Sequence, residues 1–300
     1  MAEHEKNFGR RILFSAQKNE APFLLEWIAY HKAIGFTDII LYSNDCSDGS
    51  DTLLDKLAEA GEIAHHHHTP PPEVAPQQNA SNLAQEAGLF REGDWVMWLD
   101  IDEYLVIHPG DGTLDALFAE APSFSALLVA WRIFGDSGNE TWPGRQISQS
   151  FTLAQADGDQ VFPYVKTLFK WSERIRHLDI HRPYFDEHVR PRHYSAITSN
   201  GEPVERGFYR SGADRFNRVN TQGDWWKLAQ VNHYLLRTRD MFARKRDRGR
   251  GNRPHTNDND RHVDSFYRRM NKNEVEDRSI LRFEEATTEE LARLEKVLGA

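Results

Sequence analysis

The chain has 300 residues, of which 39% are hydrophobic and 28% charged, with a single cysteine, Cys46. This composition is globular and excludes a disulfide scaffold or a cysteine-rich zinc domain. With 37 Lys and Arg against 46 Asp and Glu, the formal charge of −9 excludes a generally basic nucleic-acid binder, though not a local basic patch. We expect a cytoplasmic location, with peripheral contact at the inner membrane face as an option, because the sequence shows no signal-peptide core and no bilayer-spanning apolar run.

Strands and helices are expected to alternate over the first hundred residues. The apolar spacing predicts strands over 11–16, 37–43, 62–66 and 94–99, separated by helices over 22–34, 50–60 and 77–90. This alternation is typical of an α/β fold with a doubly wound, mostly parallel sheet and helices on both faces. Such sheets bind ligands at the carboxyl ends of their strands, so functional residues are expected just after Ala16, Ser43, His66 and Leu99.

The pattern changes after Leu99. A short helix is expected over 114–118 and further strands over 126–131, 165–171 and 175–180, whereas 224–236 is ambiguous. The chain becomes polar and rich in arginine from about 237, and an amphipathic helix over 288–298 follows near its end. Since no linker is visible, we expect one domain of residues 1–252 followed by a C-terminal extension of residues 253–300.

Three acidic residues follow the strand that ends at Leu99. Asp100 and Asp102 are two positions apart, so in an extended chain they point to the same side, and Glu103 adds a third charge. Carboxylates this close repel one another unless a cation or hydrogen-bond donors compensate them. Mg²⁺ and Mn²⁺ prefer such oxygen ligands. A solvated turn is the alternative for an isolated DxD, but its position after a buried strand favours a metal site.

The polar segment 43–50 follows the second predicted strand and precedes a helix. Its backbone donors and the helix dipole would suit an anionic nucleotide, and an ordinary Asx-rich turn is the alternative. Neither GxGxxG nor GxxxxGK[ST] occurs in the chain, which disfavours a dinucleotide-binding Rossmann domain and a P-loop protein.

Five segments resemble, in order, the successive motifs of family-2-like glycosyltransferases with the GT-A fold. They are KNEAPFLLEWIAYHKAIGF, LYSNDCSDGS, DWVMWLDIDEYL, WRIFGDSG and VNHYLLRTRDMFARKRDRG, within residues 11–252. The third segment is similar to the DxD motif of a subgroup in which it is written DIDEF. The resemblance implies a nucleotide-sugar donor, a divalent metal ion (Mn²⁺ or Mg²⁺) and sugar transfer with inversion at the anomeric carbon.

The resemblance also implies a set of residues that bind the donor. Lys18, Asn19 and Glu20 would lie beside the base and the ribose. Asn44 stands where the wider family usually has a base-contacting aspartate, and Asp48 holds the acidic position of the same segment. Uracil is the favoured base.

The metal site implied by the resemblance combines two strand ends. Asp100 would contact the ribose or a metal-bound water, and Asp102 would coordinate the metal that bridges the diphosphate. His233, in the VNHY segment, matches the histidine that completes the metal site in many GT-A enzymes. A buried core histidine is the alternative for this position.

A basic segment is the candidate for contacts with the leaving diphosphate. Residues 237–253 contain seven arginines and one lysine against two aspartates, and glycines at 249 and 251 could act as hinges of a lid. Lys245, Arg248 and Arg250 are the candidate cations. A solvated helix end or a patch for anionic lipid is the alternative, and the absence of interleaved aromatic residues disfavours nucleic acid.

The acceptor hydroxyl requires a general base, for which carboxylates are the usual choice. Asp136 lies in the FGDSG segment after a predicted strand and is the first candidate for this catalytic role. Asp179, in HLDIH, is the second candidate.

Four consecutive histidines, His65 to His68, occupy a predicted strand end. Strand alternation would send two of them to each side. We interpret them as a solvent-facing segment in preference to a zinc site.

Taken together, these features predict a metal-dependent inverting glycosyltransferase. It would move a sugar from a nucleotide sugar, with a UDP-sugar favoured, to a hydroxyl of a glycan, lipid-linked or protein acceptor in surface glycan biosynthesis. A metal-dependent phosphohydrolase is one alternative, which the position of the DxD after the fourth strand disfavours. A non-catalytic nucleotide-sugar-binding protein is the other.

Overall fold

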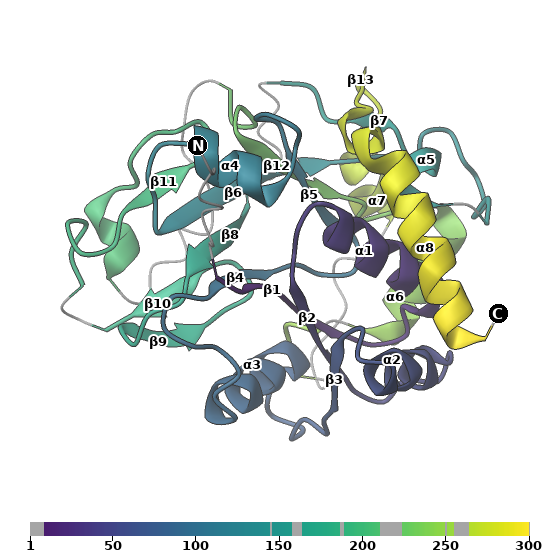
Figure 1. Cartoon of the computed structure of the whole chain (residues 1–300). Coiled ribbons are helices and arrows are strands. Elements are labelled where there is room, and N and C mark those ends of the chain that lie inside the picture. The colour runs from purple at the N-terminus through teal and green to yellow at the C-terminus, as the bar shows by residue number, and fades with distance from the viewer. Residues whose placement is uncertain are drawn as a thin grey trace, which may run out of the picture.

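The computed structural model describes residues 9–144, 146–157, 164–186, 189–210, 224–249, 251–254 and 264–299 (Figure 1). The strands are β1 (Arg11–Gln17), β2 (Asp38–Ser43), β3 (Ala64–His67), β4 (Trp95–Trp98), β5 (Glu103–Ile107), β6 (Ala126–Ile133), β7 (Leu153–Ala154), β8 (Val165–Lys170), β9 (Ile175–Leu178), β10 (Pro183–Phe185), β11 (Ala196–Thr198), β12 (Ala229–His233) and β13 (Val275–Glu276). The helices are α1 (Ala21–Ala33), α2 (Ser50–Glu59), α3 (Pro76–Glu86), α4 (Leu114–Glu120), α5 (Ile147–Ser150), η1 (Arg206–Tyr209), α6 (Arg239–Arg248), α7 (Asp264–Met270), η4 (Ser279–Phe283) and α8 (Glu284–Leu298).

The central sheet has the strand order β3-β2-β1-β4-β8-β6-β12-β5, and β11 pairs beside β6. The β3, β2, β1 and β4 strands are parallel to one another. The β8 strand runs antiparallel to both β4 and β6, so β6 and its parallel neighbour β12 point the same way as β4. The carboxyl ends of β1, β2, β4 and β12 therefore share one edge of the sheet. The expected fold class, an α/β fold with a mostly parallel sheet, is confirmed.

Alternating side chains of the strands build two cores on opposite faces of the sheet. Leu13 packs in one core with residues of α1, α2, α4 and α8, whereas its neighbours Ile12 and Phe14 pack in the other with α3 and β9. This is the two-residue period of a sheet covered on both sides. Helices cover both faces as expected, but the second face is covered largely by α3, the β9–β10 hairpin and η1 rather than by further long helices.

Several elements differ from the sequence prediction. The strand β5 begins at Glu103, pairs antiparallel with β12 at the end of the sheet and was not predicted; nor were β7, β10, β11, β13 and α7. The ambiguous segment 224–236 contains β12. The last helix begins at Glu284, four residues before its predicted start.

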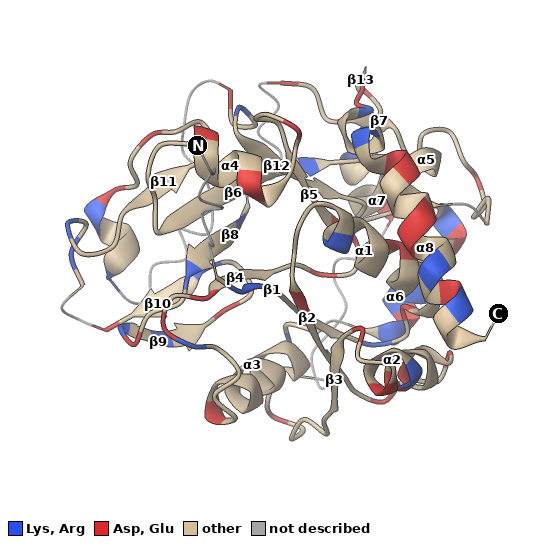
Figure 2. Cartoon of the chain, viewed as in Figure 1, with Lys and Arg blue, Asp and Glu red and all other residues tan. Residues whose placement is uncertain are grey.

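The C-terminal helix α8 lies across α1 and reaches α2 (Figure 1). Figure 2 shows acidic and basic residues spread along α8, whose Leu294 is fully buried. Among the described residues, no helix combines the length and apolar character that crossing a membrane requires.

Ion pairs and hydrogen bonds between charged side chains link α8 to α1 and to the loop that follows α2. Glu62, which follows α2, accepts hydrogen bonds from Arg293 of α8 at 2.6 and 2.5 Å and from Lys32 of α1. Glu290 of α8 lies 2.7 Å from Arg293 and 3.5 Å from Lys32. The hydrogen bonds from Arg293 and Lys32 lower the pKa of Glu62 from 4.5 to about 2, against the opposing effect of burial.

Replacing Glu62 by Gln should therefore lower the stability of the chain at neutral pH by about 1 kcal/mol, since the network is partly exposed. The pKa of Glu62 is depressed in the folded state, so its contribution is complete above pH 4.5 and is lost as the pH falls towards about 2. Urea unfolding at several pH values should show that the difference in unfolding free energy between wild type and variant becomes smaller below pH 4.5. Glu59→Gln, at an exposed position of α2, is the control; an equal effect of both substitutions, or a difference that does not depend on pH, contradicts the argument.

Candidate functional site

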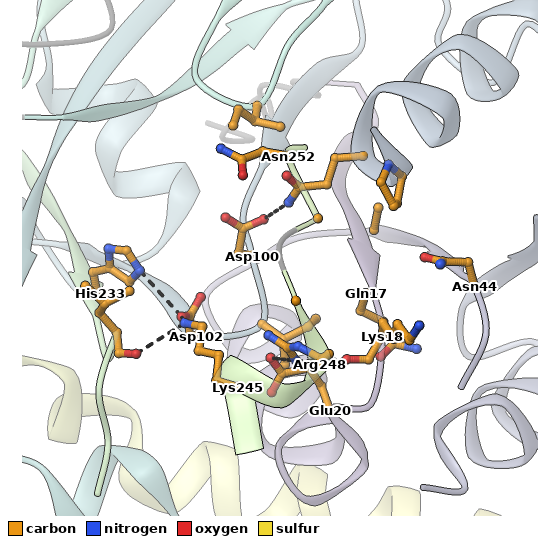
Figure 3. A pocket seen from close by; sticks show the side chains of 18 of the residues that line it. Gln17, Lys18, Glu20, Asn44, Asp100, Asp102, His233, Lys245, Arg248 and Asn252 are labelled. Carbon is orange, nitrogen blue, oxygen red and sulfur yellow. Dashed lines mark hydrogen bonds and ion pairs between the residues drawn. The ribbon is translucent and has the colours of Figure 1, made fainter. Parts of the chain in front are cut away.

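A cavity opens at the edge of the sheet where the parallel strands end (Figure 3). The strand ends contribute Gln17, Lys18, Asn44, Asp100 and His233 to its lining. The rest of the lining includes Asp102 and Glu20, residues of α6 and the start of α3. Residues that follow β1, β2 and β4 thus line the cavity, at the edge of the sheet where the sequence analysis expected them. The end of β3 does not contribute, because its histidines are absent from the lining.

Asp102 lies between two nitrogen groups inside the cavity (Figure 3). Its Oδ2 atom is 3.5 Å from Nε2 of His233 and accepts a hydrogen bond from the ammonium group of Lys245, which also donates to the carbonyl of Leu235 at 3.2 Å. Burial acts to raise the pKa of Asp102, but Lys245 and His233 outweigh it, so the pKa lies well below its usual range. Asp102 is therefore a carboxylate at neutral pH.

Asp100 and Glu103 share the buried ammonium group of Lys166 on β8. Nζ of Lys166 is 3.2 Å from Oδ2 of Asp100 and 3.0 Å from Oε2 of Glu103. Glu103 also accepts a hydrogen bond from the backbone N–H of Asp100 at 2.8 Å, and Gln77 of α3 donates to the other Asp100 oxygen at 2.7 Å. Burial lowers the pKa of Lys166, but Asp100 and Glu103 raise it more, which keeps this lysine charged. Burial raises the pKa of Glu103 well above its usual range, although Lys166 acts to lower it. The turn after β4 is therefore fixed by contacts with Lys166 and Gln77 and by the hydrogen bond from the Asp100 N–H to Glu103.

Glu20 is buried between two arginines at the start of α1. It accepts hydrogen bonds from Arg237 at 2.9 Å and from Arg248, and the guanidinium carbon of Arg237 lies 3.5 Å from the centre of the Phe23 ring. Burial acts to raise the pKa of Glu20, and the charges of Arg248 and Arg237 lower it overall. Glu20 thus holds the basic segment against the cavity.

The end of α6 and the residues after it lie over the cavity. Arg248 donates to the carbonyl of Lys18 at 2.8 Å, and the N–H of Gln77 donates to the carbonyl of Gly251 at 3.0 Å. Gly249 ends α6 with a φ of +86°, a conformation that favours glycine. The expected cations Lys245 and Arg248 therefore both reach the cavity, whereas Arg250 lies outside the described residues.

Two of the expected donor-binding residues lie outside the cavity lining. Asp48 accepts hydrogen bonds from the N–H of Ala21 at 2.9 Å and from the N–H of Ser50 at 3.0 Å, so it joins the starts of α1 and α2. The side-chain oxygen of Asn19 accepts from the N–H of Ser47 at 2.7 Å. Both side chains shape the loops that carry Lys18 and Asn44 and do not themselves line the cavity.

The two candidate bases also lie outside the cavity lining. The Asp136 carboxylate accepts hydrogen bonds from Asn271, Tyr267 and Asn273 at 2.7, 2.9 and 3.0 Å. Burial acts to raise its pKa, but these bonds and one from the Gly138 N–H lower it overall. Asp179 accepts the N–H of the following residue at 2.5 Å. The role of general base stays a prediction for both.

Sequence reasoning missed three residues that organise the site: Lys166, Gln77 and Arg237. Lys166 carried a detectable signal, because a lysine in the middle of a buried strand requires an acidic partner. Gln77 carried none, since a glutamine in the first turn of a helix is usually exposed. Nothing in the sequence distinguishes Arg237 from the other arginines of its segment.

The side chains around Asp102 have the chemistry of a divalent-metal site. Asp102 and Asp100 supply carboxylate oxygens, and burial lowers the pKa of His233, which favours the neutral ring that can bind a metal. Nδ1 of His233 is buried and has no hydrogen-bond partner among the described residues. These residue types suit Mn²⁺ or Mg²⁺, but among the described residues only the ligand atoms of Asp51, His65 and His67 all lie within 4.8 Å of one another, so a metal ion at Asp102 stays a prediction.

Comparison of the sequence with known proteins shows a family match and several proteins of similar sequence. A model of glycosyltransferase family 92 matches residues 14–201. A family 92 protein of Oryza sativa subsp. japonica is 31% identical over 144 residues, which are 46% of this chain and 24% of that protein. One of Arabidopsis thaliana is 26% identical over 154 residues, 47% of this chain and 26% of that protein. The match thus spans about a quarter of the length of these relatives.

Among solved structures, residues 1–349 of S. aureus TarS in complex with UDP match with 13% identity and a TM-score of 0.35, over 54% of this chain and 47% of that one. The sequence resemblance to glycosyltransferases is confirmed by the family match, whereas the DIDEF-type subgroup stays a prediction. Because the family model matches well over half of the chain, from β1 through the acidic segment to β11, the protein belongs to glycosyltransferase family 92.

Proposed function

We propose that this protein transfers a sugar, with inversion at the anomeric carbon, from a nucleotide sugar to an acceptor hydroxyl. Membership of a glycosyltransferase family supports the reaction class. The observation that carries the proposal is the convergence of Asp100, Asp102 and His233 with Lys245 and Arg248 around one cavity. Metal-binding and cationic groups at one point suit a diphosphate leaving group.

The metal and the base of the donor would occupy opposite ends of this cavity. Asp102, Asp100 and His233 would hold Mn²⁺ or Mg²⁺, which supplies Lewis-acid stabilisation of the leaving diphosphate when bound. Lys18 and Asn44 line the other end, where the base and ribose would bind (Figure 3). UDP is the favoured nucleotide on the sequence resemblance.

Lys245 and Arg248 would neutralise the diphosphate. In the structure both contact carboxylates: Lys245 donates a hydrogen bond to Asp102, and Arg248 donates one to Glu20. Lys245 is on the last turn of α6 and its side chain is 21% exposed, so it can turn from Asp102 towards the donor when a metal takes its place. The acceptor would be a glycan, a lipid-linked sugar or a protein in surface glycan biosynthesis.

Asp102→Asn should weaken metal-dependent donor binding, because the amide lacks the negative charge and keeps only one neutral oxygen as a ligand. We expect at least about a tenfold loss of UDP affinity in Mn²⁺. The measurement is calorimetric titration of UDP, GDP and dTDP, and of their sugars, with Mn²⁺ and with EDTA. Asp111→Asn is the control: Asp111 is exposed, accepts a hydrogen bond from the hydroxyl of Thr113 and lies outside the cavity lining.

Absence of metal-dependent binding of every nucleotide by the wild-type chain would contradict the proposal. Binding of a nucleotide sugar without any release of free nucleotide, even with an acceptor panel, would favour a non-catalytic binding protein instead. Release of inorganic phosphate from simple phosphate esters would favour a phosphohydrolase.

Asp136→Asn tests the first candidate base. If Asp136 takes the acceptor proton, sugar transfer should fall at least about 100-fold, since an amide cannot accept that proton, while UDP affinity stays unchanged. Transfer is followed as nucleotide release with an acceptor panel, and thermal unfolding checks the hydrogen-bonded loop. Asp179→Asn is the matched variant: loss of transfer there alone assigns the base to Asp179, and full activity of both variants excludes both residues.

A further inference from the structure

The four consecutive histidines divide between the two sides of the edge strand β3. His65 and His67 lie on the side of α2, with ring centres 4.5 Å apart. His66 stacks on the ring of Tyr42 at 4.8 Å on the other side, and His68 contacts the same ring. The alternation expected from a strand is thus observed, and it creates a histidine pair facing the acidic residues of α2.

Asp55 of α2 fixes which nitrogen atoms of this pair are protonated. One of its oxygens, Oδ1, lies 2.8 Å from Nδ1 of His65 and 2.8 Å from Nε2 of His67. A carboxylate oxygen at this distance accepts a hydrogen bond from each ring. The nitrogens that do not contact Asp55, Nε2 of His65 and Nδ1 of His67, are therefore the ones available to a metal.

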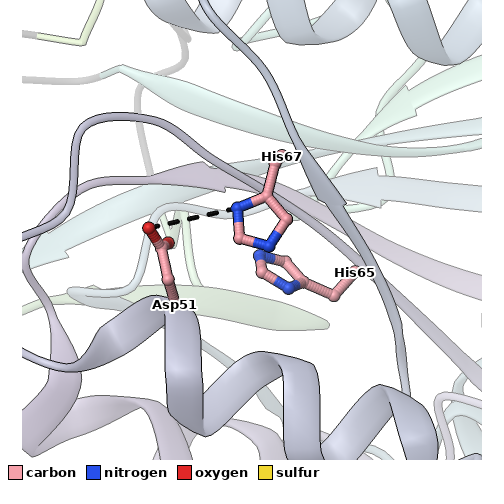
Figure 4. Close-up of side chains that lie close together, drawn as sticks. All are labelled: Asp51, His65 and His67. Atoms are coloured by element: carbon pink, nitrogen blue, oxygen red, sulfur yellow. Dashed lines mark ion pairs between the residues drawn. The ribbon is translucent and has the colours of Figure 1, made fainter.

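These two lone pairs lie beside a second carboxylate, that of Asp51 (Figure 4). Oδ2 of Asp51 is 4.0 Å from Nδ1 of His67. Its Oδ1 atom is 2.5 Å from the hydroxyl of Ser43, which is itself 2.9 Å from Nε2 of His65. The hydroxyl has one hydrogen and cannot satisfy both acceptors. Oδ1 of Asp51 and Nε2 of His65 thus compete for the one hydroxyl hydrogen of Ser43.

We propose that Asp51, His65 and His67 bind a zinc ion. One ligand atom from each residue lies within 4.8 Å of the others, so small side-chain movements bring all three to one ion. Two imidazoles and a carboxylate suit zinc, whose affinity for nitrogen ligands exceeds that of the Mn²⁺ or Mg²⁺ proposed for the cavity. Asp55 is the carboxylate that orients both rings from behind, as in other histidine–zinc sites.

The position of the cluster agrees with this role. His67 is exposed, which leaves access from solvent and room for a water ligand. The site joins α2 to β3, and none of its three residues lines the cavity.

The test is a titration of Zn²⁺ and Co²⁺ into the untagged full chain carrying Asp102→Ala, so that the cavity does not compete. We expect one equivalent of Zn²⁺ to bind in the presence of excess Mg²⁺, and Co²⁺ to give the intense visible absorption of a four-coordinate site. His67→Ala should weaken binding at least tenfold. Its side chain is exposed, so this variant should fold, which circular dichroism confirms.

His66→Ala is the matched control, because this histidine belongs to the same run but faces Tyr42, and it should bind Zn²⁺ as tightly as the parent chain. Asp51→Asn should weaken binding as His67→Ala does. Failure of the parent chain to bind one equivalent overturns the proposal. Equal losses in His66→Ala and His67→Ala overturn it too, since they indicate unspecific binding by a histidine-rich strand.

Discussion

The site depends on the compensation of buried carboxylates at one edge of the sheet by cations from distant parts of the chain. Lys166 on β8 serves Asp100 and Glu103, and Lys245 on α6 serves Asp102. A buried carboxylate without a partner costs several kcal/mol. The acidic turn after β4 therefore depends on β8 and α6 for its cationic partners, which couples the geometry of the site to the packing of these elements.

The cations in this arrangement differ in how firmly they are fixed. Lys166 is fully buried inside the sheet, with both carboxylate partners beside it, so it has no room to exchange partners. Lys245 is partly exposed at the end of a helix that is closed by a glycine in a left-handed conformation. A divalent ion at Asp102 would therefore displace Lys245 and leave Lys166 unmoved. The buried lysine sets the geometry, and the exposed one is available for the ligand.

The sequence predicts the parallel half of the fold well, because its signals are local. The hydrophobic patterns that predict β1, α1, β2 and β4 each lie within one short segment. Because ligands bind at the carboxyl ends of such strands, Lys18, Asn44 and Asp100 can be expected at one cavity, and the structure places all three in its lining. The pairing of β5 with β12 and the contact of Lys166 with Glu103 are long-range and leave no periodic trace. In sequence, Asp48 resembles a ligand-binding residue. Its carboxylate in fact accepts hydrogen bonds from backbone N–H groups, and the sequence does not reveal these contacts.

Strand alternation at the end of β2 connects the cavity with the histidine cluster. Ser43 and Asn44 are adjacent, and Ser43 turns towards Asp51 and His65 whereas Asn44 lines the cavity. Asn44 directly follows Ser43, the last residue of β2, so the placement of Ser43 constrains that of Asn44. A metal ion bound to Asp51 and His65 would fix the partners of the Ser43 hydroxyl and thereby the end of β2. The position of Asn44, at the end of the cavity proposed to bind the base, would then be supported through Ser43.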